Sequence, residues 1–265
     1  NLGRTGAAEG PAALRRALAP LAAHRVQAVD DLGDVVCAGD ALGAAQAEFG
    51  ALAAAAVGAG SLPIGLGGGR EIAYASWLGL REALDRRQDR QPVAVINLDA
   101  HFDLRADPRP SSGTPFRQIL EDAPAGGRRV DYLCLGVSRF ANTAALFERA
   151  RSLGVRHWLD EELATGHFEA ARDELVAAVG RAGHVYLTVC LDVFPAYAAP
   201  GVSAPAALGV APALVERLVE VVAASGRLRI ADVAELNPRH DVDARTARLA
   251  ARLVARIAEA AVGLS

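Results

Sequence analysis

The apolar run Val93–Leu98 ends directly in the polar segment Asp99-Ala100-His101-Phe102-Asp103. An uninterrupted apolar run of this length predicts a strand that is buried on both faces, as in a parallel sheet. Parallel sheets of α/β proteins place ligands at the carboxyl ends of their strands. Two carboxylates and one imidazole at such an end can bind a hard divalent cation. The alternative is a polar loop in which an aspartate caps the following helix.

Strands and helices are expected to alternate along the rest of the chain. Further apolar runs predict strands at residues 62–66, 130–137, 154–158, 184–191 and 228–233. Helical patterns predict helices at residues 71–86, 142–153, 168–182, 211–224 and 244–262. Repeated βα units predict an α/β fold, a three-layer α/β/α sandwich with a mostly parallel sheet. Because no linker or internal repeat divides the sequence, a single domain is expected over residues 1–265.

The composition excludes several classes of protein. Hydrophobic residues make up 52% of the 265 residues, which is enough for a substantial core. The net charge of -3 disfavours a nucleic-acid-binding surface. No stretch approaches the roughly 18 consecutive apolar residues of a membrane span, and no secretory leader is expected. The odd, sparse set of cysteines suits a reducing compartment, so we expect a cytoplasmic protein.

Two further strand ends carry acidic residues that need a partner. The strand predicted at residues 184–191 leads into Asp192. Strand alternation places Thr188, Cys190 and Asp192 on one face. A carboxylate at the end of a buried strand is stable only with a partner, and a metal ion or another cation would supply one. Glu235 follows the last predicted strand, where it faces either an amidine or guanidine group in a pocket or a neighbouring arginine.

Two loops after predicted strands are candidates for ligand contact. The glycines Gly67-Gly68-Gly69 permit a close approach of a ligand or a positive φ, and otherwise form a tight turn before a helix. The loop after the aspartate motif contains Arg105, Ser112, Thr114 and Arg117. Their hydroxyl and guanidinium groups are candidates for holding the carboxylates of a small-molecule substrate. The alternative for this segment is a solvated loop.

Several motifs occur in the order of one known family. They are Gly67-Gly-Gly-Arg-Glu71, Asp99-Ala-His-Phe-Asp-Leu-Arg105, Ser112-Gly-Thr-Pro-Phe-Arg-Gln118, Leu191-Asp-Val193, Pro200-Gly-Val-Ser-Ala-Pro205 and Ala234-Glu-Leu-Asn-Pro238. The opening Asn1–Pro11 is similar too. With these motifs the chain resembles the arginase (ureohydrolase) superfamily, and within it most of all the formimidoylglutamases. The resemblance implies an arginase-like fold and hydrolysis of a C–N bond in a linear amidine. N-formimidoyl-L-glutamate and water would give L-glutamate and formamide, in histidine catabolism.

The resemblance also implies a metal centre, because the family holds two Mn²⁺ ions. The matching ligand positions are Asp99, His101, Asp103 and Asp192. Cys190 stands where the family has a further aspartate, and Arg70 stands where it has a histidine. A guanidinium has no lone pair with which to bind a cation. A Cys190 thiolate remains a candidate ligand, although Mn²⁺ prefers oxygen and imidazole ligands.

The other roles implied by the resemblance follow the same motifs. His101 and Asp103 would act in catalysis, with Asp103 holding and relaying a proton, and Glu235 would orient the cationic amidine. The carboxylates of the glutamate would be held by Arg105, Ser112, Thr114 and Arg117. The family often forms trimers or hexamers, which implies a homo-oligomer. Its members usually have a first strand ahead of the position of Asn1, which this sequence lacks.

Arg70 and Cys190 leave three arrangements of the metal centre open. One is a two-metal centre with loosened ligation. A second is a single ion on Asp99, His101 and Asp192, with Arg70 in place of the charge of the other ion. The third is a centre without metal, in a non-catalytic homologue of the family. A remaining functional alternative is another ureohydrolase, of the agmatinase or guanidinobutyrase type.

Overall fold

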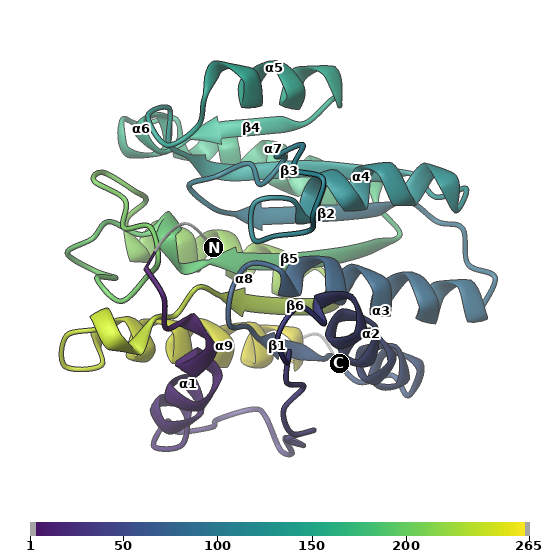
Figure 1. The fold of residues 1–265 in the computed structure, drawn as a ribbon, viewed down its shortest axis with the longest axis horizontal. Coiled ribbons are helices and arrows are strands. Elements are labelled where there is room, and N and C mark those ends of the chain that lie inside the picture. Colours follow the sequence, from purple (N-terminus) through teal and green to yellow (C-terminus); the bar gives the residue numbers. More distant parts are fainter. Residues whose placement is uncertain (1–3, 263–265) are drawn as a thin grey trace.

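The computed structural model describes residues 4–262, and the strands among them form one parallel sheet (Figure 1). The strand order is β1-β6-β5-β2-β3-β4, and every neighbouring pair is parallel. The strands are β1 (Ile64–Leu66), β2 (Val93–Leu98), β3 (Val130–Val137), β4 (Arg156–Leu159), β5 (His184–Cys190) and β6 (Leu228–Ala234). The first three residues of the opening motif, and the last three residues of the predicted domain, lie outside the described range.

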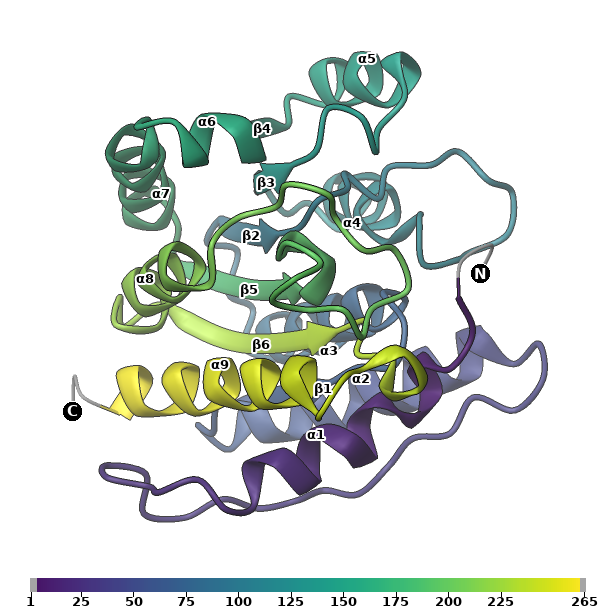
Figure 2. The same cartoon turned by 90° about the vertical axis from the view of Figure 1, so that its left-hand side faces the viewer.

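Helices cover both faces of this sheet (Figure 2). One face carries α2 (Leu42–Gly58), α3 (Ile72–Arg86), α4 (Pro115–Ala125) and α5 (Ala144–Ser152). The other face carries α1 (Gly10–Leu18), α6 (Asp160–Ala164), α7 (Phe168–Arg181), α8 (Pro212–Ala223) and α9 (Arg245–Val262). Short 3-10 turns are η1 (Ala7–Glu9), η2 (Leu191–Val193) and η3 (Pro238–His240). The predicted α/β/α sandwich with a parallel sheet is confirmed.

The core consists of two apolar layers that the central strands separate. In β2, Ala94, Ile96 and Leu98 pack towards one layer, and Val93 and Val95 pack towards the other. Every residue of this strand is buried, as its uninterrupted apolar sequence predicts. Each such aliphatic side chain contributes about 1.5–3 kcal/mol on burial. The two layers therefore fix β2 rigidly at the centre of the sheet.

The neighbouring strands β2 and β5 form the topological switch point of the sheet. The chain leaves β2 towards β3 on one side, and it leaves β5 towards β6 on the other. Where the connections of two adjacent parallel strands diverge, the loops beyond their carboxyl ends leave a crevice. The segments at this position are the ones that begin with Asp99 and Asp192. The fold thus brings together two motifs that lie far apart in the sequence.

The predicted elements are close to the observed ones, but helices α1, α2 and α6 were not predicted and one further segment needs correction. The strands predicted at residues 93–98 and 130–137 have those bounds, and the other predicted elements shift by one or two residues at an end. The interpretation of the segment after Asp103 as a polar loop was wrong for the second half of that segment, because Pro115–Ala125 forms α4. Pro115 is preorganised for the first turn of a helix, and Phe116 and Ile119 bury its inner face.

Helix α2 was not predicted, since its sequence does not repeat apolar and polar residues with the period of an amphipathic helix. It is rich in alanine, which has the highest helix propensity, and it packs closely on α3. A Cβ atom at Gly79 of α3 would lie 2.7 Å from the Cβ of Ala53 and 2.8 Å from the carbonyl oxygen of Gly50. Glycine at this crossing therefore permits a contact that any side chain would block.

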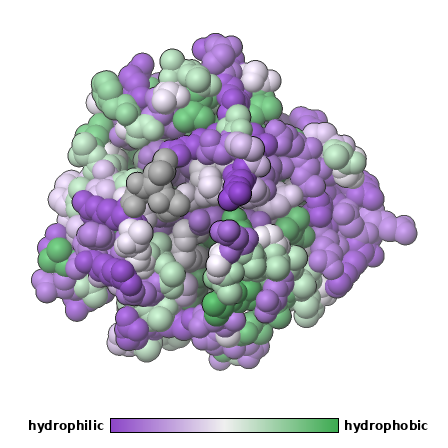
Figure 3. All heavy atoms as spheres, viewed as in Figure 1, coloured by the Kyte–Doolittle hydropathy of each residue, from purple (hydrophilic) through white to green (hydrophobic). Residues whose placement is uncertain are grey.

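The outer surface is mixed in character (Figure 3). In this view hydrophilic residues gather on the right, over the ends of α3 and α4. The sequence there is Arg86-Arg87-Gln88-Asp89-Arg90-Gln91, which ends α3 and leads into β2. Within residues 4–262, none of the helices has the length and apolar character needed to cross a bilayer.

Candidate active site

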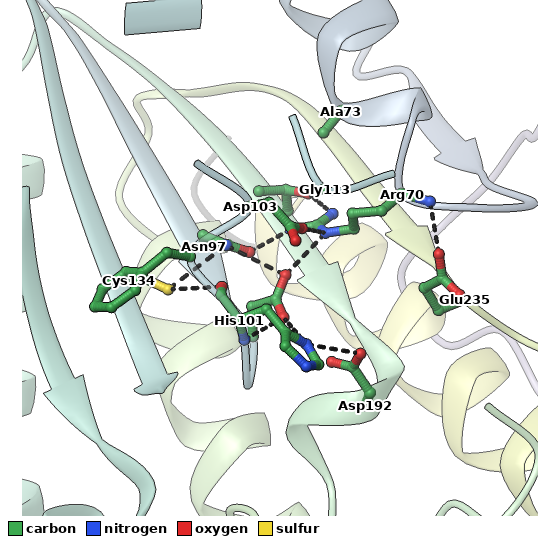
Figure 4. Close-up of polar contacts among 12 residues, drawn as sticks. Arg70, Ala73, Asn97, His101, Asp103, Gly113, Cys134, Asp192 and Glu235 are labelled. Atoms are coloured by element: carbon green, nitrogen blue, oxygen red, sulfur yellow. Dashed lines mark hydrogen bonds and ion pairs between the residues drawn. The ribbon is translucent and has the colours of Figure 1, made fainter. Parts of the chain in front are cut away.

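Four strand ends supply the candidate site (Figure 4). Arg70 follows β1, the Asp99-to-Asp103 motif follows β2, Asp192 follows β5 and Glu235 follows β6. Because all four strands are parallel and adjacent, their carboxyl ends open on the same edge of the sheet. The close-up shows the side chains of Arg70, His101, Asp103 and Asp192 directed towards a common centre. The sequence prediction that separate strand ends converge is therefore confirmed.

Asp99, His101 and Asp192 form a group that can hold a metal ion. Their ligand atoms all lie within 4.8 Å of one another. The Nδ1 atom of His101 lies 3.1 Å from Asp192 Oδ2 and 3.6 Å from Asp99 Oδ1. Asp192 Oδ1 is buried and has no hydrogen-bond partner. Since an orphaned buried carboxylate oxygen is unfavourable, this donor set fits one divalent cation.

The charges of this group are strongly coupled. Burial lowers the pKa of His101, but Asp192 and Asp99 raise it more, so that it reaches about 12. Burial raises the pKa of Asp99, and Arg70 and His101 outweigh it and hold the pKa at about 2. The imidazole of the metal-free protein is therefore protonated between two carboxylates. A metal ion has to displace that proton, because only neutral imidazole is a ligand.

Arg70 lies beside this group, against Asp99, and is 2% exposed. Its Nε donates to Asp99 Oδ2 at 2.9 Å and lies 3.5 Å from Asp103 Oδ2. Burial lowers the pKa of this guanidinium, but Asp99 and the other acidic neighbours raise it well above its ordinary value. Arg70 is thus a fixed positive charge beside the candidate metal group. A second metal ion bound by Asp99 and Asp103, as the family resemblance implies, does not fit these residues.

Asp103 and Cys190 lie outside the group of three metal-binding residues that the described chain contains. Asp103 faces Arg70 instead, and burial raises its pKa well above the ordinary value. Burial likewise raises the pKa of the Cys190 thiol. A neutral thiol is a poor ligand for manganese, so the geometry does not favour the predicted metal contact of Cys190.

Glu235 directly follows β6, and its carboxylate lies next to the backbone of Arg70. Its Oε1 accepts a hydrogen bond from the backbone N–H of Arg70 at 2.8 Å, and its Oε2 is buried without a partner. Burial raises the pKa of Glu235 to about 7. Glu235 has a φ of 74° and Asp103 has a φ of 50°, both in the left-handed region. Such backbone strain in non-glycine residues is typical of functional sites.

The residues of the predicted substrate loop differ in whether their side chains are exposed or bound within the loop. Arg105 is exposed, and its side chain lies against Gly113. The Thr114 hydroxyl is buried, donating to the Ser111 carbonyl and lying 2.9 Å from Gln118 Oε1. Arg117 Nε donates to the Arg105 carbonyl at 2.7 Å, and its Nη2 donates to the Asp107 carbonyl at 3.2 Å. These contacts favour a role for Thr114 and Arg117 in shaping the loop that presents Arg105.

Sequence reasoning missed the polar row beneath Arg70. Asn97 on β2 is in register with Thr188 on β5, which is in register with Asp232 on β6. Thr188 Oγ1 accepts from Arg70 Nη1 at 2.5 Å and donates to Asp232. Asn97 Oδ1 accepts from Arg70 Nη2. A signal was present in the sequence, since each of these residues is a polar side chain among mainly apolar neighbours on its strand and so requires a buried polar partner.

The glycines after β1 serve packing. None of Gly67, Gly68 and Gly69 has a positive φ, so of the alternatives that the sequence left open for them, the positive φ is excluded. A Cβ atom at Gly67 would lie 2.9 Å from the Cβ of Ala234. The glycine therefore lets the end of β1 approach β6 closely and brings Arg70 into the pocket. The opening segment closes over the same region, because Asn237 Nδ2 donates to the carbonyls of Arg4 and Thr5 at 3.3 and 3.0 Å.

Comparison with known proteins identifies the family. The arginase family model matches residues 1–259. The chain belongs to the arginase family. Among arginase-family relatives, formimidoylglutamase from Ralstonia nicotianae is 54% identical over 98% of this chain and 80% of its own length. Formimidoylglutamase from Rhodococcus jostii is 49% identical over 97% of this chain and 80% of its own.

Solved arginase-family structures agree with the fold. Formimidoylglutamase from Bacillus subtilis superposes with a TM-score of 0.84 at 22% identity, covering 98% of this chain and 83% of that one. Trypanosoma cruzi formiminoglutamase, solved with Mn²⁺, superposes with a TM-score of 0.82 at 26% identity, covering 98% of this chain and 88% of that one. The relatives at 54% and 49% identity confirm the resemblance to formimidoylglutamases that the motifs predict.

Proposed function

We propose that this arginase-family chain is a hydrolase of linear amidines that converts N-formimidoyl-L-glutamate and water into L-glutamate and formamide. The observation that carries the proposal is the convergence of a metal-binding group with an unpartnered glutamate oxygen. Asp99, His101 and Asp192 form a group that could hold a metal ion, and Glu235 Oε2 lies buried without a partner at the end of β6, next to the strand that leads into Asp192. The similarity to formimidoylglutamases supports this substrate over agmatine or guanidinobutyrate.

The metal would be held by Asp99, His101 and Asp192. Carboxylate and imidazole donors suit Mn²⁺, and a relative of similar fold was solved with that ion. Bound there, a divalent cation would supply a water activated for attack near neutral pH. His101 would serve as a ligand and would lose its ring proton when the ion binds.

Glu235 binds and orients the amidine. The formimidoyl group is cationic when protonated, so its N–H groups donate charge-assisted hydrogen bonds to a carboxylate. Such a contact satisfies the Oε2 atom that has no partner in the protein. It also holds the amidine carbon on the side of the pocket that faces Asp99 and Asp192. Orientation of this kind lowers the entropic part of the barrier.

Asp103 holds the proton that the leaving nitrogen requires. Its side chain is 12% exposed, and burial raises its pKa, which favours the protonated form. When water adds to the amidine carbon and the bond to the glutamate nitrogen breaks, that nitrogen takes a proton and leaves as an amine. The carbon then remains in formamide, with the oxygen of the added water. Asp103 is the candidate group for relaying this proton.

The glutamate end of the substrate would meet the loop after Asp103. We assign its two carboxylates to Arg105 and Ser112, which lie at or near the surface of that loop. Thr114 and Arg117 act through the loop, which they hold by the contacts described above. An arginine at this position disfavours a purely cationic substrate such as agmatine. The cytoplasmic location and the homo-oligomer expected for the family stay predictions.

Product analysis tests the function. The protein, loaded with Mn²⁺, is incubated separately with N-formimidoyl-L-glutamate, agmatine and guanidinobutyrate, and formamide and urea are measured. Formamide from the first substrate, without urea from the others, is expected. The Glu235→Gln variant should lose most of this activity, and Asp131→Asn, at the opposite end of the sheet, should retain it. Absence of formamide from a folded, metal-loaded protein would favour the non-catalytic homologue, and urea would favour an agmatinase or guanidinobutyrase.

A further inference from the structure

We propose that the Arg70 guanidinium takes the place of a second metal ion, so that this centre binds a single divalent cation. The proposal rests on the proposed function and specifies its metal requirement. Arg70 Nε lies between Asp99 Oδ2, at 2.9 Å, and Asp103 Oδ2, at 3.5 Å. An ion held by these two oxygens would occupy the space of that nitrogen. The guanidinium and such an ion therefore exclude each other.

The two carboxylate oxygens of Asp99 face different partners. Its Oδ2 accepts from Arg70 Nε, and its Oδ1 accepts from the backbone N–H of His101 at 2.8 Å and faces the His101 ring. His101, which this oxygen faces, belongs with Asp99 and Asp192 to the group that could hold a metal ion. The Asp99 carboxylate thus lies between that group and the Arg70 guanidinium.

The position of Arg70 is built by several elements. Thr188 Oγ1 lies 2.5 Å from Nη1, Asp232 Oδ1 lies 3.5 Å from Nη1, and Asn97 Oδ1 accepts from Nη2. Asp232 is held in turn by the hydroxyls of Ser76 and Tyr186, at 2.7 and 2.5 Å. The ring of Phe116 lies 5.1 Å from the guanidinium carbon. A side chain with this many fixed partners does not swing aside to admit an ion.

The charge of the pocket favours one additional cation and disfavours two. Asp99 and Asp232 are buried and Asp103 is half-buried, and all three lie within 3.5 Å of the Arg70 guanidinium. Asp192 is a further buried acid, which lies against His101. One divalent ion at Asp99, His101 and Asp192 compensates the negative charge of the aspartates that the Arg70 guanidinium does not neutralise. A further divalent ion would lie against the guanidinium, with no water between them to screen the repulsion. The charges of the acids, of Arg70 and of a single divalent ion therefore leave no place for a second ion.

Metal stoichiometry tests the proposal without relying on activity. The protein is stripped with a chelator, titrated with Mn²⁺ in a calorimeter, and measured for metal per chain after gel filtration. One tight site per chain is expected, with the six-line electron paramagnetic resonance spectrum of an isolated Mn²⁺. Two tight sites, or the exchange-coupled spectrum of an ion pair, would overturn the proposal. Failure of the wild-type protein to bind any Mn²⁺ would overturn it equally.

Substitutions at the pocket sharpen the test. The double variant Arg70→His with Cys190→Asp supplies an imidazole and a carboxylate, and it should bind a second Mn²⁺ with a coupled spectrum. The matched control is Arg128→His, which removes another buried arginine that pairs with Asp85 away from the pocket. This control should keep one site. A folded double variant that still binds one ion would contradict the proposal. If the variant does not fold, the number of Mn²⁺ ions bound per wild-type chain decides.

The result separates this proposal from the proposed function. One Mn²⁺ per chain without formamide production would support the role of Arg70 and contradict the activity. Two Mn²⁺ per chain with formamide production would support the activity and contradict the role of Arg70. Both readouts come from the same preparation of the full chain.

Discussion

The Nδ1 atom of His101 lies 3.1 Å from Asp192 Oδ2, although the two residues follow different strands. The contact exists because β2 and β5 are neighbours in the sheet, while their connections leave in opposite directions. It joins an imidazole and a carboxylate at the point where an α/β sheet binds ligands. The proposed metal site and the proposed reaction both depend on this contact.

Removal of the Asp192 carboxylate should abolish tight metal binding. Asp192→Asn keeps the shape of the side chain but removes the negative charge that the ion requires. We expect Mn²⁺ affinity to fall by at least about 100-fold, with formamide production falling in parallel. Calorimetry and product analysis measure the two effects. Asp131→Asn serves as the control, since Asp131 pairs with Arg156 at the start of β3, and unchanged affinity in Asp192→Asn would exclude this ligand set.

Metal binding should strengthen as the pH rises. His101 in the metal-free protein has a pKa raised to about 12, so its ring is protonated at neutral pH. Because Mn²⁺ displaces that proton, the apparent affinity should rise roughly tenfold per pH unit below this pKa. Titrations in two buffers of different ionisation enthalpy would measure the release of about one proton per ion. Binding without proton release would mean that the His101 ring is not a ligand.

The pKa of Glu235 makes stability depend on pH in a definite direction. The folded-state pKa of Glu235 is raised from 4.5 to about 7. The contribution of its protonated carboxyl to the free energy of unfolding is therefore fully present below about pH 4.5, and it is lost as the pH rises through about 7. In the metal-free protein this group should lower the free energy of unfolding by roughly 3 kcal/mol between those limits. Urea unfolding of Glu235→Gln and wild type should therefore diverge with rising pH, with the variant relatively more stable at about pH 8. A constant difference across this range would contradict the burial of an ionisable Glu235.

Loss of the Arg70 guanidinium should be costly to the metal-free fold. Arg70→Met leaves Asp99, Asp103 and Asp232 without their buried cation, and breaking such a pair costs about 3–5 kcal/mol. Arg128→Met should cost less, because its partner Asp85 is 39% exposed and regains water. Urea unfolding of the two variants in chelator measures the difference. Equal losses would indicate that the pocket around Arg70 is hydrated.

The left-handed backbone at Asp103 predicts an unusual order of variants. With φ at 50°, any side chain at this position is strained, whereas glycine is not. Asp103→Gly should therefore be more stable than Asp103→Ala by about 1 kcal/mol, while both lose activity. Thermal unfolding of the two metal-free variants provides the comparison. If the alanine variant is the more stable one, the strain is absent.

The convergence of Asp99, His101 and Asp192 could be predicted from sequence. The strand at residues 93–98 is apolar throughout, which fixes a buried parallel strand, and the parallel topology then fixes where its polar end lies. The same reasoning placed Asp192 and Glu235. What these residues share is a sharp change from apolar strand to acidic loop, and such a change can be read from one sequence.

The partners of Arg70 could not be predicted in the same way. The sequence of each strand indicates that Asn97, Thr188 and Asp232 need buried partners, but that all three meet Arg70 depends on the register of the three strands, which no local pattern specifies. Helix α4 was missed for a related reason, because its first turn continues a polar motif that resembles a loop. Both features are decided by packing across the sheet.

Anomalous diffraction from a crystal soaked in MnCl₂ tests the account most directly. We predict one manganese peak per chain, bonded to Asp99, His101 and Asp192, with Arg70 still between Asp99 and Asp103. Two peaks, or a single peak bonded to Asp103 in place of His101, would contradict the account.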